Sequence, residues 1–217
     1  MDLLEVQAFA REALDASSNG HIDVHVRQVM WSELGPPTPD RHLERGGTLS
    51  DAHRARTVLM NECLRTALDD WKSDAARASE PLLDDRDSPP TIVGRVDSWL
   101  SGKLAFDQLN RDAQRLQDLS FYFFELHEEY PKAELIASAA TSVLWIAVYD
   151  QASDYDAEYR EEDNEVFPAD FMIAWLRAGC APWDETGGPE TAGRRASFWR
   201  WYIDELYPKC WSISRRD

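Results

Sequence analysis

The sequence predicts an all-α protein, a single multi-helix, bundle-like domain over residues 1–217 with a long irregular region near its N-terminus. Three observations support this fold class. Apolar residues recur at steps of three and four, prolines and glycines stand where helices should begin and end, and no segment alternates like a half-buried strand. A chain of 217 residues that is 43% hydrophobic can bury the core of one such domain.

The N-terminal part combines one clear helix with a segment that has no clear pattern. Apolar residues from Leu3 to Leu14 at helical spacing predict a helix that ends near Ser17, where SSNG begins. Residues 19–49 are expected to be irregular, because GPPTPDRHLERGGTLS holds three prolines and three glycines. Within this region HIDVHVRQVMW is compatible with a short strand or a short helix, and the whole region with a short appendage.

The middle of the chain predicts three helices separated by turns. Ser50 is placed to cap a long helix over residues 51–78, which should end before Pro81. The second helix ends near Leu100, and Gly102 follows at the position of a C-terminal cap. The third covers FDQLNRDAQRLQDLSFYFFELHEEY, and its aromatic cluster should be deeply buried because it is apolar nearly all round.

The C-terminal half predicts three further helices. Pro131 fits the first turn of PKAELIASAATSVLWIAVYDQA, and the small residues at 137–140 permit close packing, so this helix should be central. Pro168 opens a helix that should stop at Gly179. The final helix, PETAGRRASFWRWYIDELYPKCW, carries aromatic residues at helical spacing that are expected to lie in the core.

The charge and the cysteines limit the partners and the compartment. The chain has 40 Asp and Glu against 23 Lys and Arg, and this net charge of −17 repels nucleic acid and anionic membranes and attracts basic proteins. No segment resembles a secretory signal or a membrane span. Cys63, Cys180 and Cys210 are odd in number and widely spaced, as expected of reduced thiols. We therefore expect a cytoplasmic protein that binds neither nucleic acid nor membrane.

The residue types that most often carry chemistry form no recognisable catalytic or metal site. His21 and His25 are four residues apart, but the third ligand and the general-base glutamate of the zinc motif are absent. His127 and Glu128 also lack a partner histidine, and no histidine near Cys180 in sequence would activate its thiol. There is no Gly-rich phosphate loop. The sequence predicts no enzyme activity, no cofactor and no metal.

The most distinctive feature is DYDAEYREEDNE, residues 154–165, called the acidic stretch below. Its seven carboxylates are Asp154, Asp156, Glu158, Glu161, Glu162, Asp163 and Glu165. Five of them match the ligand spacing of a twelve-residue calcium loop, but Tyr159 replaces the glycine of the sharp turn and a cation, Arg160, follows it. A solvated or partner-facing surface is therefore the preferred interpretation, with cation binding as the alternative.

The last quarter of the chain resembles a known family. DFMIAWLRAGCAPW and RRASFWRWYIDELYP are similar to the pattern of the all-helical immunity-protein family numbered five in bacterial polymorphic toxin systems. The matching residues are Asp170, Phe171, Ala174, Ala178, Gly179 and Trp183, followed by Arg194, Arg195, Phe198, Trp199, Trp201, Tyr202 and Pro208. Cys180 stands where the family pattern has a second glycine. The resemblance implies a protein that binds and neutralises a cognate toxin made by the same cell, without catalysis of its own.

The charge pattern suggests how such a protein would bind its toxin. From Asp150 to Asp170 there are nine acidic residues and one arginine, a local charge of −8 between two predicted helices. A nuclease or another effector with a basic cleft would be attracted to it, so the seven carboxylates of the acidic stretch are the predicted partner-binding residues. The alternative is a small-molecule or cation-binding helical domain that uses the acidic stretch or the aromatic residues of FWRWYIDELY.

Overall fold

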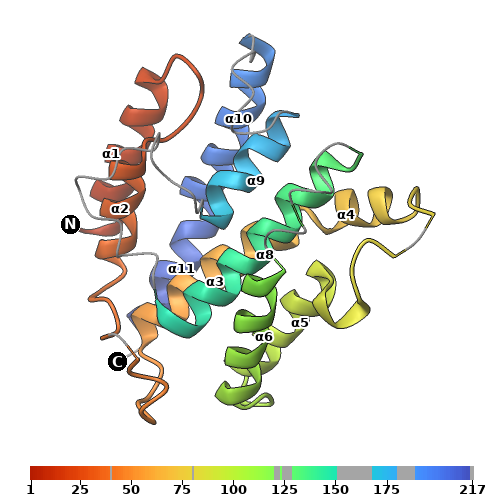
Figure 1. The fold of residues 1–217 in the computed structure, drawn as a ribbon. Coiled ribbons are helices and arrows are strands. Elements are labelled where there is room, and N and C mark those ends of the chain that lie inside the picture. The colour runs from red at the N-terminus through yellow and green to blue at the C-terminus, as the bar shows by residue number, and fades with distance from the viewer. Residues whose placement is uncertain are drawn as a thin grey trace.

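The structure is a computed structural model that describes residues 1–39, 41–79, 81–119, 123, 129–150, 168–179 and 189–215. These residues are mainly helical and include no strand, which confirms the all-α prediction (Figure 1). The elements are α1 (Leu3–Ala16), α2 (Val24–Glu33), α3 (Asp51–Arg65), α4 (Leu68–Ala75), η1 (Asp85–Asp87), α5 (Pro89–Leu100), α6 (Phe106–Asp118), α8 (Pro131–Tyr149), α9 (Ala169–Ala178), α10 (Pro189–Trp201), η4 (Tyr202–Leu206) and α11 (Tyr207–Ile213).

Helix α8 is the centre of the fold, as predicted. It packs against α3, α4, α5, α6 and α9, and fourteen of its nineteen residues are buried. In Figure 1, α3 and α8 cross the middle of the molecule, with α1 and α2 on one side and α5 and α6 on the other. Among the described helices α8 alone is long and apolar enough to cross a membrane, but 78% of its apolar window is buried inside the protein. It is therefore a core helix that the other helices surround.

Several predicted helix ends are confirmed. Helix α1 ends at Ala16 with Ser17 as its C-cap, and Pro131 lies in the first turn of α8, where its missing N–H loses no helical hydrogen bond. Gly102 and Gly179 follow α5 and α9 with φ angles of +74° and +78°. Glycine adopts this left-handed conformation without the steric penalty of a side chain, so both helices end where the sequence places a glycine.

The region over 19–49 is more regular than the sequence indicated. The expectation of a long irregular N-terminal region was wrong over ten residues, because α2 lies within it. Asp23 caps this helix, and Arg27 and Trp31 on it are 1% and 0% exposed. With a buried arginine among its core residues the helix has no clean apolar stripe, so tertiary contacts rather than periodicity determine it. The described residues after this helix, 35–39 and 41–49, form no regular helix or strand, as expected.

The long helix predicted over 51–78 consists of α3 and α4 with a break between them. Its start is confirmed, since Ser50 Oγ accepts a hydrogen bond from the backbone N–H of His53 at 3.1 Å. Thr66 lies at the break, and its hydroxyl donates to the carbonyl oxygen of Cys63 at 2.8 Å. Such side-chain bonds to the preceding turn compete with regular helical hydrogen bonding.

The final predicted helix contains a π-helical turn, η4, between α10 and α11. The N–H of Tyr207 donates to the carbonyl of Tyr202 instead of to that of Ile203. Five residues after Ile203 comes Pro208, which has no N–H, so no donor of the wider turn reaches the Ile203 carbonyl. The side-chain amide of Gln7 on α1 fills this role at 2.8 Å and joins the two ends of the chain.

The turn between α1 and α2 passes close to α10. Gly20 in this turn has a φ of +69°, and a Cβ atom there would lie 2.0 Å from the carbonyl oxygen of Ala192. Both the backbone conformation and the close approach require glycine at this position. The turn thereby places the start of α2 against the C-terminal helices.

Candidate functional site

The predicted partner-binding residues lie outside the residues that the structure describes. This applies to Asp154, Asp156, Glu158, Glu161, Glu162, Asp163 and Glu165, and therefore also to the calcium-loop alternative. The described residues do not include His127, Glu128 or Cys180 either. The structure does describe both ends of the chain that leads into and out of the acidic stretch, Asp150 and Pro168, and each end adjoins a buried ion pair.

Asp150 ends α8 and is held by three hydrogen bonds to its carboxylate. Its backbone is left-handed, with φ +56° and ψ +32°, and its N–H donates to the carbonyl of Ile146 at 2.9 Å. Arg56 of α3 binds the carboxylate with two parallel bonds, Nε to Oδ1 at 2.7 Å and Nη2 to Oδ2 at 2.6 Å. The backbone N–H of Thr38 donates to Oδ2 at 2.7 Å. Both charged side chains are 0% exposed.

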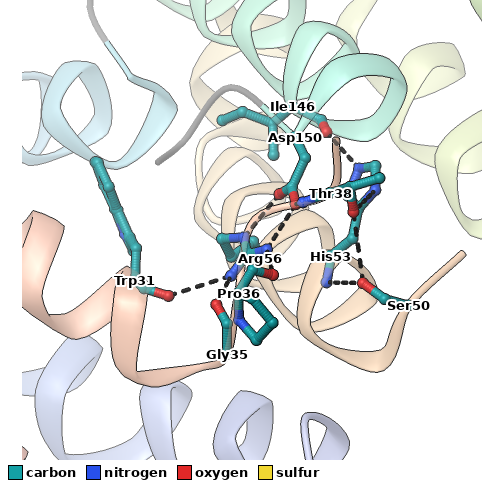
Figure 2. Close-up of polar contacts among 9 residues, drawn as sticks. All are labelled: Trp31, Gly35, Pro36, Thr38, Ser50, His53, Arg56, Ile146 and Asp150. Atoms are coloured by element: carbon teal, nitrogen blue, oxygen red, sulfur yellow. Dashed lines mark hydrogen bonds and ion pairs between the residues drawn. The ribbon is translucent and has the colours of Figure 1, made fainter. Parts of the chain in front are cut away.

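Arg56 uses all five of its N–H groups (Figure 2). Two bind Asp150, and the other three donate to the backbone carbonyls of Trp31 at 3.2 Å, Gly35 at 2.9 Å and Pro36 at 3.1 Å. A buried guanidinium is tolerated only when its donors are paired, and this one is fully paired. It joins the end of α2, the loop after it, α3 and the last turn of α8.

His53, one turn before Arg56 on α3, adds a further link at this place. Its Nε2 lies 2.7 Å from the carbonyl oxygen of Ile146, and its Nδ1 lies 3.1 Å from the hydroxyl of Thr38 (Figure 2). A carbonyl only accepts, so Nε2 carries the proton and Nδ1 accepts from the hydroxyl. Burial lowers the pKa of His53, although the charge of Asp150 opposes this shift. The neutral ring therefore fits the site.

The other end of the acidic stretch enters α9 through Asp170, which is 0% exposed. Its Oδ1 accepts from Arg27 Nη1 at 3.2 Å and from the N–H of Phe171 at 2.7 Å. The guanidinium carbon of Arg27 also lies 5.6 Å, 5.2 Å and 5.7 Å from the ring centres of Trp31, Phe171 and Trp199. Among its contacts within the described residues, Arg27 thus combines a carboxylate with aromatic faces.

The Asp170 carboxylate is less completely bonded than that of Asp150. Within the described part of the chain no hydrogen bond reaches its Oδ2 at normal geometry. Burial raises the pKa of Asp170, and Arg27, the N–H of Phe171 and the nearby hydroxyl of Tyr202 oppose the rise without cancelling it. The protonated form of this carboxyl is therefore easier to reach than for an exposed aspartate.

The two buried ion pairs reduce the charge that the region around the acidic stretch can present to a partner. The local charge of −8 counts Asp150 and Asp170, but both are buried and paired with arginines from elsewhere in the chain. What remains is the acidic stretch itself, with seven acidic residues and one arginine, a formal charge of −6.

Sequence reasoning missed Arg27 and Arg56 as the partners of these carboxylates. Their partners are 143 and 94 residues away, so no local pattern reveals the pairs. One signal was available. Arg56 stands three residues before Leu59 and seven before Cys63, both fully buried, so it occupies a core position of the helix.

The other candidates form no site in the described part of the chain. His21 is buried, and its Nδ1 accepts from the indole N–H of Trp199 at 3.1 Å, whereas His25 is exposed, so the two do not face one ion. No group of three or more His, Cys, Asp or Glu suited to a metal occurs among the described residues. Phe198 and Tyr202 are buried and both pack edge-on against Trp199, which makes them core residues rather than a ligand cage.

The described residues form an all-α protein in which buried ion pairs link helices that are far apart in the sequence. A comparison with protein families assigns residues 8–209 to Immunity protein Imm5, which is nearly the whole chain. The protein therefore belongs to this immunity-protein family, as the resemblance of its last quarter indicated. No curated protein matched the chain significantly.

The structure gives a physical role to several residues that carry the family resemblance. Asp170, Phe171 and Trp199 all surround the guanidinium of Arg27. These residues lie in α9 and α10, whereas Arg27 lies in α2. In this chain, three residues that carry the family resemblance therefore surround a buried arginine from the N-terminal part of the chain.

Proposed function

We propose that the protein binds and neutralises one cognate toxin through an acidic surface centred on the acidic stretch, without catalysis of its own. Membership in the immunity-protein family supports a toxin partner in general. The charge of −6 within twelve residues supports this stretch as the contact surface. The buried pairs at Asp150 and Asp170 add support, because they neutralise the flanking carboxylates and leave the stretch as the concentrated charge.

The chemistry of the surface suggests the chemistry of the partner. A nuclease or another effector with a basic cleft is the best match, since its cleft and the acidic stretch are of opposite sign. Attraction of this kind raises the association rate, and like-charge repulsion excludes acidic proteins that are not the target. A net charge of −17 disfavours nucleic acid and anionic membranes as partners, and the neutralisation is proposed to take place in the cytoplasm.

The first experiment identifies the toxin. The tagged protein is expressed in its host, proteins that co-purify with it are identified, and a product of a neighbouring gene that kills cells lacking this protein is taken as the toxin. Co-expression should protect those cells. If no co-purifying protein is toxic, or if protection fails, the proposed function is wrong.

The second experiment tests the surface. Asp156, Glu158, Glu161, Glu162 and Asp163 are replaced by Asn or Gln, and a control variant carries the same replacements at Glu12, Asp85, Asp107, Asp118 and Glu205, which are exposed elsewhere. Each variant loses five negative charges, so the change in net charge is the same in both. We expect about a tenfold or larger fall in association rate, and a flatter salt dependence, for the first variant alone. Equal losses in both would show that net charge, not the acidic stretch, governs binding.

A further inference from the structure

We propose that Asn19, in the turn between α1 and α2, is a site of spontaneous deamidation that two hydrogen-bond donors of the turn promote. The chain has four asparagines, and Asn19 is the one that is followed by a glycine. Asparagine is a thermolabile residue type, and Gly20 has no Cβ atom to keep its backbone nitrogen away from the preceding side chain. Asn19 is also exposed, so solvent reaches the reacting atoms.

The reaction needs only water besides the chain itself. The backbone nitrogen of Gly20 loses its proton to solvent and attacks Cγ of Asn19, and the side-chain amide nitrogen leaves as ammonia. The new bond closes a five-membered succinimide ring, in which the Gly20 nitrogen joins Cγ and the backbone carbonyl carbon of Asn19. Water then opens this ring at one of the two carbonyls. Opening at Cγ gives aspartate, and opening at the backbone carbonyl gives isoaspartate, whose main chain runs through Cβ.

Two donors of the turn point at Oδ1 of Asn19. The hydroxyl of Ser17 donates to this atom at 2.7 Å, and the backbone N–H of His21 donates to it at 3.1 Å. When the Gly20 nitrogen attacks Cγ, negative charge develops on Oδ1. Donors that already point at the atom where charge develops stabilise the tetrahedral intermediate, as in an oxyanion hole. The turn therefore lowers the barrier to ring closure at this asparagine.

Both donors are held in place by the surrounding structure. The side chain of His21 is 7% exposed, and its Nδ1 accepts from the indole N–H of Trp199 at 3.1 Å. The oxygen of the Ser17 hydroxyl accepts from the His21 N–H at 3.0 Å while its proton is directed to Asn19. Donors that are fixed before the reaction need no rearrangement during it.

The attacking nitrogen is held more loosely than the donors. The N–H of Gly20 donates to the carbonyl of Ser17 at 3.4 Å, which is long for a hydrogen bond between these atoms. Asn19 and Ser18 lie in the wall of an open hollow of about 400 Å³ at the end of α1. Water can therefore take the proton of Gly20 and later open the ring.

The two products fit the fold differently. An aspartate at position 19 keeps the backbone and offers a carboxylate oxygen to the same two donors. Isoaspartate lengthens the main chain by one carbon directly before Gly20, where φ is +69° and a Cβ atom would lie 2.0 Å from the carbonyl oxygen of Ala192. Because the chain has no room to shift at this close approach, isoaspartate should loosen the contact between the turn and α10.

The test uses the purified full-length protein alone, incubated at neutral pH either folded or unfolded in guanidinium chloride. Mass spectrometry of the peptide that contains Asn19 follows the conversion of the amide to a carboxyl group, and isoaspartate-specific methylation detects the second product. Ser17→Ala removes one donor to Oδ1. Ser18→Ala is the matched control, because this neighbouring hydroxyl is exposed and is not one of the two donors. Asn19→Gln is the reference that cannot close the five-membered ring.

The rates decide whether the fold promotes the reaction. We expect Asn19 in the folded protein to react at least as fast as in the unfolded chain, where the donors are dispersed. Asn61 and Asn110, which lie in α3 and α6 before residues other than glycine, should stay intact in the folded protein. Ser17→Ala should slow the reaction about threefold or more, and Ser18→Ala should leave its rate unchanged.

The stability of the aged protein tests the consequence for the turn. The isoaspartate form, separated by chromatography, should unfold at a lower denaturant concentration than the unmodified protein, and incubated Asn19→Gln should keep its initial midpoint. An intact Asn19 in the folded protein, under conditions in which the unfolded chain reacts, would overturn the proposal. Equal rates in Ser17→Ala and Ser18→Ala would overturn the role of the donors, and an isoaspartate form of unchanged stability would overturn the loosened turn.

Discussion

The two buried arginine–aspartate pairs beside the acidic stretch use the same side chains in different ways. At Asp150 the pair is bidentate, with distances of 2.6 Å and 2.7 Å, and every donor of Arg56 is bonded. At Asp170 one contact of 3.2 Å is combined with the aromatic faces around Arg27. Hydrogen bonds are directional, whereas attraction to a ring acts over a broad face. Within the described residues, directional hydrogen bonds therefore dominate the contacts of the first pair, and ring contacts make up a larger share of those of the second.

The largest effect is expected from removal of the guanidinium at the fully bonded pair. Arg56→Met should lower the free energy of unfolding by about 3–5 kcal/mol, because it removes the cation that is paired with the buried Asp150 carboxylate and the donor to three buried backbone carbonyls. Urea denaturation of both proteins measures the difference. The exposed Arg65→Met, tested in parallel, should cost about 0–1 kcal/mol. A loss at Arg56 as small as that of the control would contradict the central role of this pair.

Matched replacement of the two aspartates tests their difference directly. Asp150→Asn places an NH2 or a carbonyl where Oδ2 accepts from Arg56 and Thr38, whereas the Oδ2 of Asp170 has no such bond within the described residues. We expect Asp150→Asn to destabilise the protein by about 2–3 kcal/mol more than Asp170→Asn. Unfolding curves recorded side by side give this difference. If Asp170→Asn costs more stability than Asp150→Asn, the Asp150 carboxylate is not the more strongly bonded of the two.

A third buried carboxylate, Glu134 in the first turn of α8, extends the comparison. Burial raises its pKa to about 7 from 4.5, and the hydroxyl of Ser138 opposes this only in part. Because the folded pKa is above the unfolded one, the stabilisation is fully present below pH 4.5 and is lost as the pH rises through about 7. Relative to Glu134→Gln, the wild type should lose up to about 2 kcal/mol over this window. Urea midpoints of both proteins measured across pH should show this loss of stability in the wild type. If the two proteins lose stability with pH in parallel, Glu134 does not contribute it.

The sequence predicts the parts of this fold that depend on local signals. The cap at Ser50, the proline at the start of α8 and the glycine after α9 are local, and the structure confirms all three. At α2 the sequence left a short strand and a short helix as alternatives, because Arg27 interrupts the apolar face and the partner of that arginine is 143 residues away. The break at Thr66, where the hydroxyl bonds to the carbonyl of Cys63, lies inside an apolar pattern that continues through it, so the pattern predicts one long helix.

The candidate site shows the same limit. Seven carboxylates within twelve residues are visible in the sequence, but nothing local separates them from Asp150 and Asp170, which belong to the core. That distinction depends on Arg56 and Arg27, and it becomes visible once the helices are placed together. The contact role of the acidic stretch itself stays a prediction.

The π-helical turn at Tyr202–Leu206 works as a one-residue insertion in the last helix. In an uninterrupted α-helix Trp199 and Tyr207, eight residues apart, would differ by about 80° around the axis, but one inserted residue reduces this to roughly 20°. Both side chains are 0% exposed, so the insertion is what lets α10 and α11 share one buried face. Deleting one residue from this turn would rotate α11 by about 100° and turn Tyr207 away from the carbonyl of Met30, to which it donates at 2.7 Å. A single extra residue in η4 therefore sets the rotation of α11 relative to α10. We expect a substitution in this turn to disturb the buried aromatic face less than an insertion or a deletion.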